Sequence, residues 1–136
     1  MKVNAFVFEK PGAAGVMKWR TFELGDPGPG EALVRHTAIG LNYIDIYHRS
    51  GLYPLQFPSG LGLEAAGVVE AVGKGVTHVK KGDRVAYGTG TLGAYSEARI
   101  MPAQHLLKLP NGISDEEGAA MMLKGMTVEY LFNRTY

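Results

Sequence analysis

Short runs of alternating apolar and polar residues follow one another as far as Pro110, and glycine or proline separates most of them. Alternation with a period of two is typical of strands that have one buried face. Turns such as Asp26–Gly30 are rich in proline and glycine, which preset or permit the backbone angles of a turn. Short strands at a spacing of roughly 8–12 residues favour a barrel or sandwich, so we expect a mainly β domain. The predicted strands are Lys2–Phe8, Met17–Leu24, Ala32–Leu41, Ala65–Val72, Arg84–Tyr87, Ala94–Ile100 and His105–Leu109.

A short helix is predicted directly after the third strand. Asn42 suits the N-cap position, because its side-chain oxygen can accept a hydrogen bond from a free amide of the first turn. Residues at helical spacing then extend over Tyr43–Ser50, and Gly51 permits the left-handed backbone that often ends a helix.

The spacing of apolar residues becomes helical near the C-terminus. Ser114 and Glu117 form a capping box, a reciprocal arrangement that starts a helix. We predict one helix over Asp115–Leu123, an interruption near Gly125, and a second helix over Met126–Arg134. Both helices would expose an apolar face, and an exposed patch of that kind favours association.

The bulk composition is that of one globular domain. The 136 residues are 46% hydrophobic and 20% charged, which is sufficient for a core of its own. A net charge of +1 without a basic block gives no expectation of nucleic acid or an anionic membrane as partner. The lack of cysteine excludes disulfides, thiolate nucleophiles and thiolate metal sites. With no signal-peptide pattern and no run near the ~20 apolar residues of a membrane span, a cytoplasmic protein is expected.

The stretch 40–67 concentrates the candidate chemistry. Polar side chains and aromatic rings crowd together there, beside the glycine-framed hexapeptide Gly62–Gly67. Such a mixture suits a cleft better than a core, because polar groups need partners or water. The crowded residues are Asn42, Tyr43, Asp45, Tyr47, His48, Arg49 and Tyr53.

The hexapeptide GLEAAG resembles a motif of the zinc-dependent alcohol dehydrogenases in the medium-chain dehydrogenase/reductase superfamily, but the metal ligands are missing. Those enzymes have a cysteine where Asn42 stands and a histidine where Leu63 stands. Leucine has no lone pair, and a neutral amide is a poor zinc ligand. The cysteines of the structural zinc lobe are absent too. We therefore expect no metal.

Further motifs cover nearly the whole chain, in the order Ala38–Asp45, Tyr47, Arg49–Pro54, Pro58–Gly67, Gly82–Val85 and Leu123–Tyr130. Together they resemble the zinc-independent branch of that superfamily, the zeta-crystallin-like NADPH:quinone oxidoreductases. The resemblance implies a GroES-like β-barrel catalytic domain over residues 1–123. Residues 124–136 would begin a nucleotide-binding domain, whose glycine-rich fingerprint is not in this sequence.

The same resemblance implies hydride transfer from NADPH to a quinone or an activated alkene, without zinc. Because the cofactor supplies the reactivity, the protein would chiefly orient the reactants. Tyr53 would line the quinone side, and residues from Lys124 onward would contact the cofactor at the domain junction. The implied cofactor-binding residues are Asn42, Tyr43, Ile44, Asp45, Tyr47, Lys124, Thr127 and Tyr130. The implied catalytic residues are Asn42, Asp45, Tyr47 and Tyr53.

Without the nucleotide fingerprint, we expect the isolated chain to bind NADPH weakly and to turn over negligibly. The choice of quinone or enone, and of NADPH over NADH, is left open by these residues. Any homodimer is expected to form mostly through the nucleotide-binding domain. The alternative is a non-catalytic GroES-like binding or assembly module that uses the two C-terminal helices.

Several of these side chains also have a purely structural interpretation. Asn42 could be only an N-cap, and Asp45 could fix a neighbouring loop or pair with Arg49 one helical turn later. His48 is expected to be solvated on its helix. Glu64 could be a buried structural carboxylate that orients the loops of the cleft. Core or interface positions are expected for Met121, Met122 and Met126.

Overall fold

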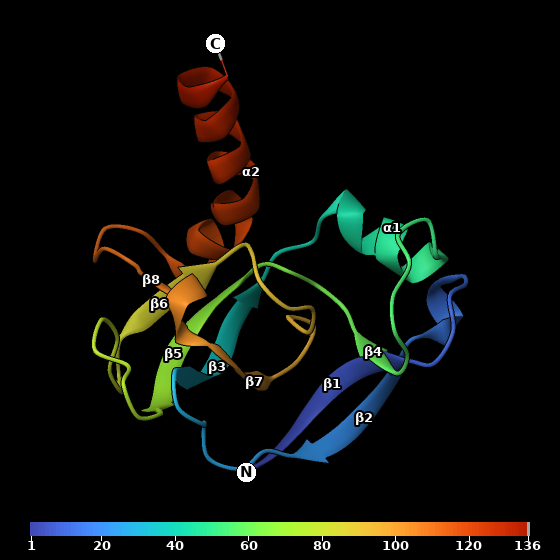
Figure 1. Cartoon of the computed structure of the whole chain (residues 1–136), viewed down its shortest axis with the longest axis horizontal. Coiled ribbons are helices and arrows are strands. Elements are labelled where there is room, and N and C mark those ends of the chain that lie inside the picture. The colour runs from blue at the N-terminus through green and yellow to red at the C-terminus, as the bar shows by residue number, and fades with distance from the viewer. Residues whose placement is uncertain (136) are drawn as a thin grey trace.

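Two antiparallel sheets form the body of the protein in the computed structural model, which describes residues 1–135 (Figure 1). The smaller sheet has the strand order β2-β1-β4, and the larger has the order β7-β3-β5-β6-β8. The strands are β1 (Lys2–Phe8), β2 (Lys18–Glu23), β3 (Glu31–Ile39), β4 (Ser59–Gly60), β5 (Ala65–Val72), β6 (Arg84–Tyr87), β7 (Ala98–Pro102) and β8 (Leu107–Lys108). The helices are α1 (Tyr43–Ser50) and α2 (Asp115–Arg134), with 3-10 turns η1 (Ala14–Val16) and η2 (Ala103–His105).

The main core lies on the inner side of the larger sheet and is built from small and β-branched residues. A second, smaller cluster lies between this sheet and the first half of α2, where Ala66 and Ala86 meet Ala119 and Met122. The main cluster comprises Ala32, Val34, Ala65, Val69, Val79, Val85, Tyr87, Ala94, Met101, Ala103 and Leu106. The prediction of a mainly β, barrel-like domain is confirmed.

Most predicted strands match the structure, and the differences fall where the chain leaves the ladder. β1, β5 and β6 have the predicted bounds. The strand predicted over Ala94–Ile100 begins only at Ala98, because the backbone of Tyr95 bonds Leu61 and Phe6 instead of β3. Of the strand predicted over His105–Leu109, only the two residues of β8 pair. The two-residue β4 was not predicted.

The two helices predicted at the C-terminus are one continuous helix, so the interruption near Gly125 was wrong. A glycine in an exposed helical position costs only about 1 kcal/mol relative to alanine, which good helix formers on both sides can offset. Met122 packs in the core and Met126 lies against it, as expected, whereas Met121 is exposed. The C-terminal half of α2 extends away from both sheets (Figure 1).

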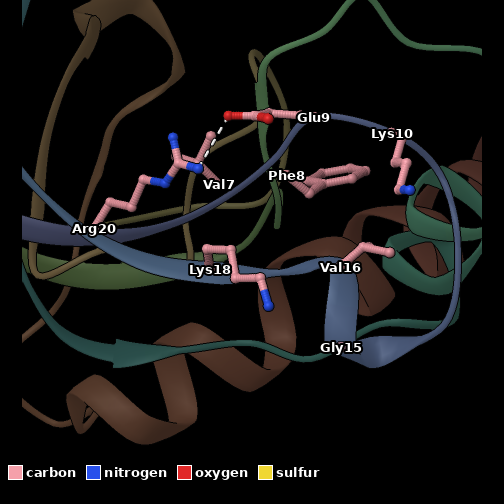
Figure 2. A pocket seen from close by; sticks show the side chains of 8 residues that line it. All are labelled: Val7, Phe8, Glu9, Lys10, Gly15, Val16, Lys18 and Arg20. Carbon is pink, nitrogen blue, oxygen red and sulfur yellow. Dashed lines mark ion pairs between the residues drawn. The ribbon is translucent and has the colours of Figure 1, made fainter.

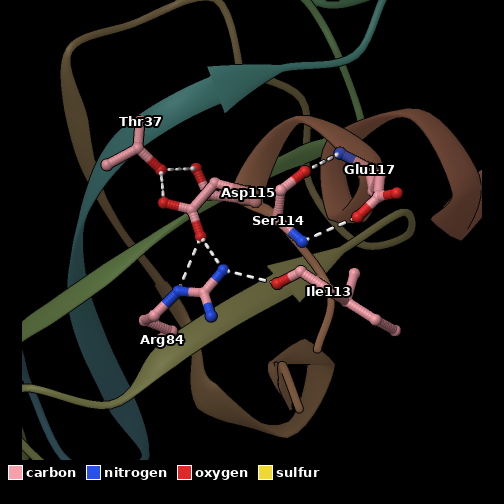
Figure 3. Close-up of polar contacts among 7 residues, drawn as sticks. Thr37, Arg84, Ile113, Ser114, Asp115 and Glu117 are labelled. Atoms are coloured by element: carbon pink, nitrogen blue, oxygen red, sulfur yellow. Dashed lines mark hydrogen bonds and ion pairs between the residues drawn. The ribbon is translucent and has the colours of Figure 1, made fainter. Parts of the chain in front are cut away.

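An ion pair and a hydroxyl hydrogen bond fasten the first turn of α2 to the larger sheet, and a capping box closes that turn (Figure 3). Asp115 accepts hydrogen bonds from Thr37 Oγ1 on β3 at 2.7 Å and from Arg84 Nε on β6 at 2.8 Å. The Thr37 hydroxyl and the Arg84 guanidinium together hold the pKa of Asp115 below its usual range. The predicted capping box is present, since Ser114 and Glu117 exchange side-chain-to-backbone hydrogen bonds of 2.8 and 3.1 Å. The start of α2 is thereby fixed relative to the sheet.

A half-buried histidine joins the larger sheet to the segment before β7. His36 Nδ1 lies 2.7 Å from the Ser96 carbonyl oxygen, which can only accept, so Nδ1 carries the proton. Nε2 then accepts from the Tyr87 hydroxyl at 2.8 Å. Burial lowers the pKa of His36 to about 4 and raises the pKa of the Tyr87 hydroxyl. The imidazole is neutral at pH 7.

We expect this histidine to weaken the fold in mild acid. The folded-state pKa of about 4 lies below the ordinary value of 6.5, so the unfolded chain takes up the proton first as the pH falls. The free energy of unfolding should drop by up to about 3 kcal/mol between pH 6.5 and 4 on this account. Urea denaturation across that range should show a shallower drop for His36→Gln. The exposed His78→Gln serves as the control, and an equal slope for wild type and His36→Gln would contradict the assignment.

Candidate functional site

The side chain of Asn42, at the N-cap of α1, lies between an anion and a cation. Only 8% of Asn42 is exposed. Its Nδ2 donates to Glu64 Oε2 at 2.6 Å, and its Oδ1 accepts from Lys124 Nζ at 2.8 Å. Helix α1, the segment before β5 and helix α2 therefore meet at this amide.

Asp45 lies one turn into α1 and is 2% exposed. Its Oδ2 accepts from the Asn42 backbone N–H at 3.0 Å and from the Tyr95 hydroxyl at 2.8 Å. Burial, and then the bond to Asp45, raise the pKa of Tyr95. Among residues 1–135, Asp45 Oδ1 has no hydrogen-bond partner. The alternative pairing with Arg49 is wrong, because Arg49 donates instead to the Gly12 carbonyl oxygen.

An aromatic array covers the exposed face of α1. Tyr43, 77% exposed, has its ring centroid 6.5 Å from that of Tyr47, which lies 5.6 Å from the ring of Tyr53. His48 packs edge-on against Tyr53 at 5.7 Å and is half-buried, so its predicted solvation was wrong. These rings present flat apolar surface and phenol groups to the outside of the domain.

The predicted residues on α2 reach this site unequally. Lys124 is bonded to Asn42, whereas the Thr127 hydroxyl donates to the Leu123 carbonyl oxygen of its own helix at 2.8 Å. Tyr130 is 58% exposed, farther along α2. Ile44 is half-buried on α1. The structure thus brings Asn42, Asp45 and Lys124 into one polar network and leaves Thr127 and Tyr130 outside it.

Two members of this network were not among the predicted site residues. Glu64 is buried, as the structural interpretation expected, but it also contacts Asn42 directly. Its signal in the sequence was a carboxylate framed by glycine and alanine in an otherwise apolar segment. Tyr95 had no local signal, because its partner Asp45 is 50 residues away.

A sizeable cavity lies elsewhere, on the β1–β2 hairpin (Figure 2). Its volume is about 500 Å³, and no predicted site residue lines it. A smaller apolar cavity of about 230 Å³ adjoins the site, lined by Phe6, Trp19, Ile39, Gly40, Leu41 and Tyr95. The candidate site is therefore assigned by the chemistry of its side chains and not by cavity volume. The network of buried carboxylates and the aromatic array both lie beside α1, away from the cavity on the β1–β2 hairpin.

Within residues 1–135, no cluster of three or more His, Cys, Asp or Glu side chains is arranged to hold a metal ion. Neither helix in the described part of the chain has the length and apolar character needed to cross a bilayer.

The fold agrees with that of a known family. Residues 28–111 match the model of the alcohol dehydrogenase GroES-like domain. The chain belongs to this family. The expected GroES-like architecture is thereby confirmed for the stretch that contains β3, α1, β5 and β6.

Relatives of this GroES-like domain are longer proteins. A quinone oxidoreductase of Pseudomonas aeruginosa is 55% identical over 95% of the chain, which covers 40% of that relative. A 2-haloacrylate reductase of a Burkholderia species is 44% identical over 98% of the chain, which covers 42% of it. The crystal structure of Escherichia coli quinone oxidoreductase complexed with NADPH matches 98% of the chain with a TM-score of 0.95 at 48% identity, and the chain covers 41% of it. The chain thus spans about 40% of the length of these relatives.

Close backbone approach at Gly40 is required for the site to assemble. A Cβ on Gly40 would lie 2.3 Å from the Ala119 carbonyl oxygen and 2.4 Å from Glu64 Oε2. We expect Gly40→Ala to lower the free energy of unfolding by about 1–3 kcal/mol, because α2 or Glu64 must move. Gly125→Ala is the control: nothing lies within 4 Å of its added Cβ, and it should stabilise α2 by up to ~1 kcal/mol. Equal urea midpoints for wild type and Gly40→Ala would show that the contact is not tight.

Proposed function

We propose that this domain forms one wall of the active site of an NADPH-dependent quinone oxidoreductase. Hydride would pass from NADPH to a quinone or an activated alkene. Support comes from the names of the similar proteins, which are quinone oxidoreductases and a 2-haloacrylate reductase. The observation that carries the proposal is the Asn42 amide, held between Glu64 and Lys124 beside an exposed aromatic array.

The residues present fit a nicotinamide nucleotide. In residues 1–135 Lys124 makes no ion pair, so its ammonium keeps a full positive charge for an anionic ligand. Tyr43 offers an exposed ring for stacking, and its neighbour Asn42 offers amide hydrogen-bonding groups. NADPH supplies the hydride when bound. Two related crystal structures, from Escherichia coli and a mycobacterium, are complexes with NADPH.

The quinone side of the proposed site consists of aromatic and apolar groups. Tyr47 and Tyr53 can stack on a flat ring, and their phenols can donate to its oxygens. The apolar cavity beside Leu41 and Trp19 would exclude water from one side of the reactants. The task of these side chains is orientation, since well-placed reactants gain several orders of magnitude in rate from proximity alone.

The rest of the active site would lie in a nucleotide-binding domain. We place the boundary between the domains after Leu123, within α2, with residues 124–136 beginning the second domain. Tyr136 lies outside the described residues. Alone, the chain should bind NADPH with an affinity weaker than micromolar and should turn over negligibly, because no glycine-rich turn in residues 1–135 leads from a strand into a helix N-terminus that could cradle a pyrophosphate.

A chimera tests this function. Joining Tyr136 to the part of the Pseudomonas aeruginosa quinone oxidoreductase that follows the matched stretch should give NADPH-dependent reduction of 1,4-benzoquinone. Lys124→Ala should raise the KM for NADPH roughly tenfold, the loss of about 1.4 kcal/mol of binding. The exposed Lys81→Ala is the matched control and should leave the KM unchanged. A folded chimera without quinone reduction, or one in which both lysine variants behave alike, would contradict the proposal.

A second candidate function is an assembly module, favoured by the exposed side chains on the outer half of α2. Val128, Leu131 and Phe132 are all exposed there. If this face mediates assembly, the isolated chain should associate at micromolar concentration, and Phe132→Asp should abolish the association. Size-exclusion chromatography with light scattering decides between the two: a monomer at every concentration contradicts the module.

A further inference from the structure

Glu64 is the most deeply buried charged group near the site, with 0% of its surface exposed. No cation pairs with it among residues 1–135. Its oxygens accept from Asn42 Nδ2 at 2.6 Å and from the Leu123 backbone N–H at 2.8 Å. A buried carboxylate is costly unless its hydrogen bonds are satisfied, so both donors are needed to keep it in place.

The two neighbours of Asn42 fix the orientation of its amide. A carboxylate can only accept hydrogen bonds, and an ammonium can only donate them. The NH₂ of Asn42 must therefore face Glu64, and its oxygen must face Lys124. If the amide were flipped, its oxygen would face the Glu64 carboxylate and its NH₂ would face the Lys124 ammonium. Neither hydrogen bond could then form.

Glu64 also holds the helix that carries the lysine. Its second oxygen bonds the N–H of Leu123, the residue directly before Lys124, in the middle of α2. A backbone N–H at such a position ordinarily bonds the carbonyl four residues earlier. The Glu64 carboxyl group thereby holds the helix backbone next to Lys124 directly. Through Asn42 it also fixes the direction of the Lys124 side chain.

We propose that Glu64 is a positioning residue for Asn42 and Lys124, acting through the amide and not by touching the reactants. The inference rests on the proposed function for its catalytic consequence, but the positioning itself can be measured in this chain alone. Asp45, the other buried carboxylate, bonds the Asn42 backbone and Tyr95, and so does not duplicate the role.

The first test is side-chain amide NMR of the full 136-residue chain. The two Nδ2 protons of Asn42 should be far apart in chemical shift, because one faces a carboxylate, whereas those of the exposed Asn111 should not. Glu64→Gln should markedly reduce the separation, since a neutral amide has a single, uncharged acceptor oxygen where the carboxylate offers one charged oxygen to each donor. Glu70→Gln, six residues farther along on β5 and paired with Arg35, is the matched control. An unchanged Asn42 pair in folded Glu64→Gln overturns the proposal.

The second test is a double-mutant cycle in the chimera. Glu64→Gln should raise the KM for NADPH about tenfold and leave the KM for the quinone unchanged. In the Lys124→Ala background it should add less than about twofold, because the two residues act as one unit. Additive effects, or equal effects on both substrates, would mean a general structural role and overturn the proposal.

If Glu64→Gln does not fold, Asn42→Ala replaces it, since this change breaks the link while leaving the carboxylate. Its effect on the KM for NADPH should be smaller in the Lys124→Ala background than in the wild type, and full additivity would again count against positioning. A chimera without activity refutes the proposed function alone, because the NMR result still decides whether Glu64 orients Asn42.

Discussion

The buried carboxylate of Glu64 is the constraint on which the arrangement of this domain depends. Because no cation pairs with it in the described part of the chain, it requires neutral donors from two separate elements, the amide at the start of α1 and a backbone N–H in the middle of α2. Satisfying it therefore brings the two helices together at one point. The same contact places a lysine and an amide side by side at the edge of the barrel.

Two glycines of the barrel make the contact between Glu64 and α2 possible, because they have no side chain at the points where the backbone approaches the helix. Gly40 and Gly88 both lie so close to α2 that an added Cβ would be 2.3 Å from the Ala119 carbonyl oxygen and 2.7 Å from the Leu123 nitrogen, respectively. The ion pair of Arg84 with Asp115 then fixes the first turn of the helix. Such a scaffold can orient reactants precisely, because the sheet is rigid and the helix packs closely against it. The half-exposed aromatic array beside them would provide the contact surface.

Local features of this molecule were predictable, and long-range ones were not. The bounds of α1 followed from Asn42 and Gly51, whose φ of 89° is the left-handed conformation expected at a C-cap. The continuity of α2 through Gly125 was missed, because packing at Ala119 and Met122 outweighs the small penalty of one glycine. The bonds of Glu64 to Leu123 and of Asp45 to Tyr95 span 59 and 50 residues, so no local pattern encodes them. Asn42 and Lys124 were assigned to one site only through the family resemblance, which did not imply their contact, and the functional roles of both residues remain predictions.

A through-hydrogen-bond NMR coupling tests the central contact most directly. In the ¹⁵N,¹³C-labelled chain, the amide nitrogen of Leu123 should show a scalar coupling to the side-chain carboxyl carbon of Glu64, because the hydrogen bond between them is 2.8 Å long. A coupling of the Leu123 nitrogen to the Ala119 carbonyl carbon alone would show an ordinary helical bond. That result would contradict the role assigned to Glu64.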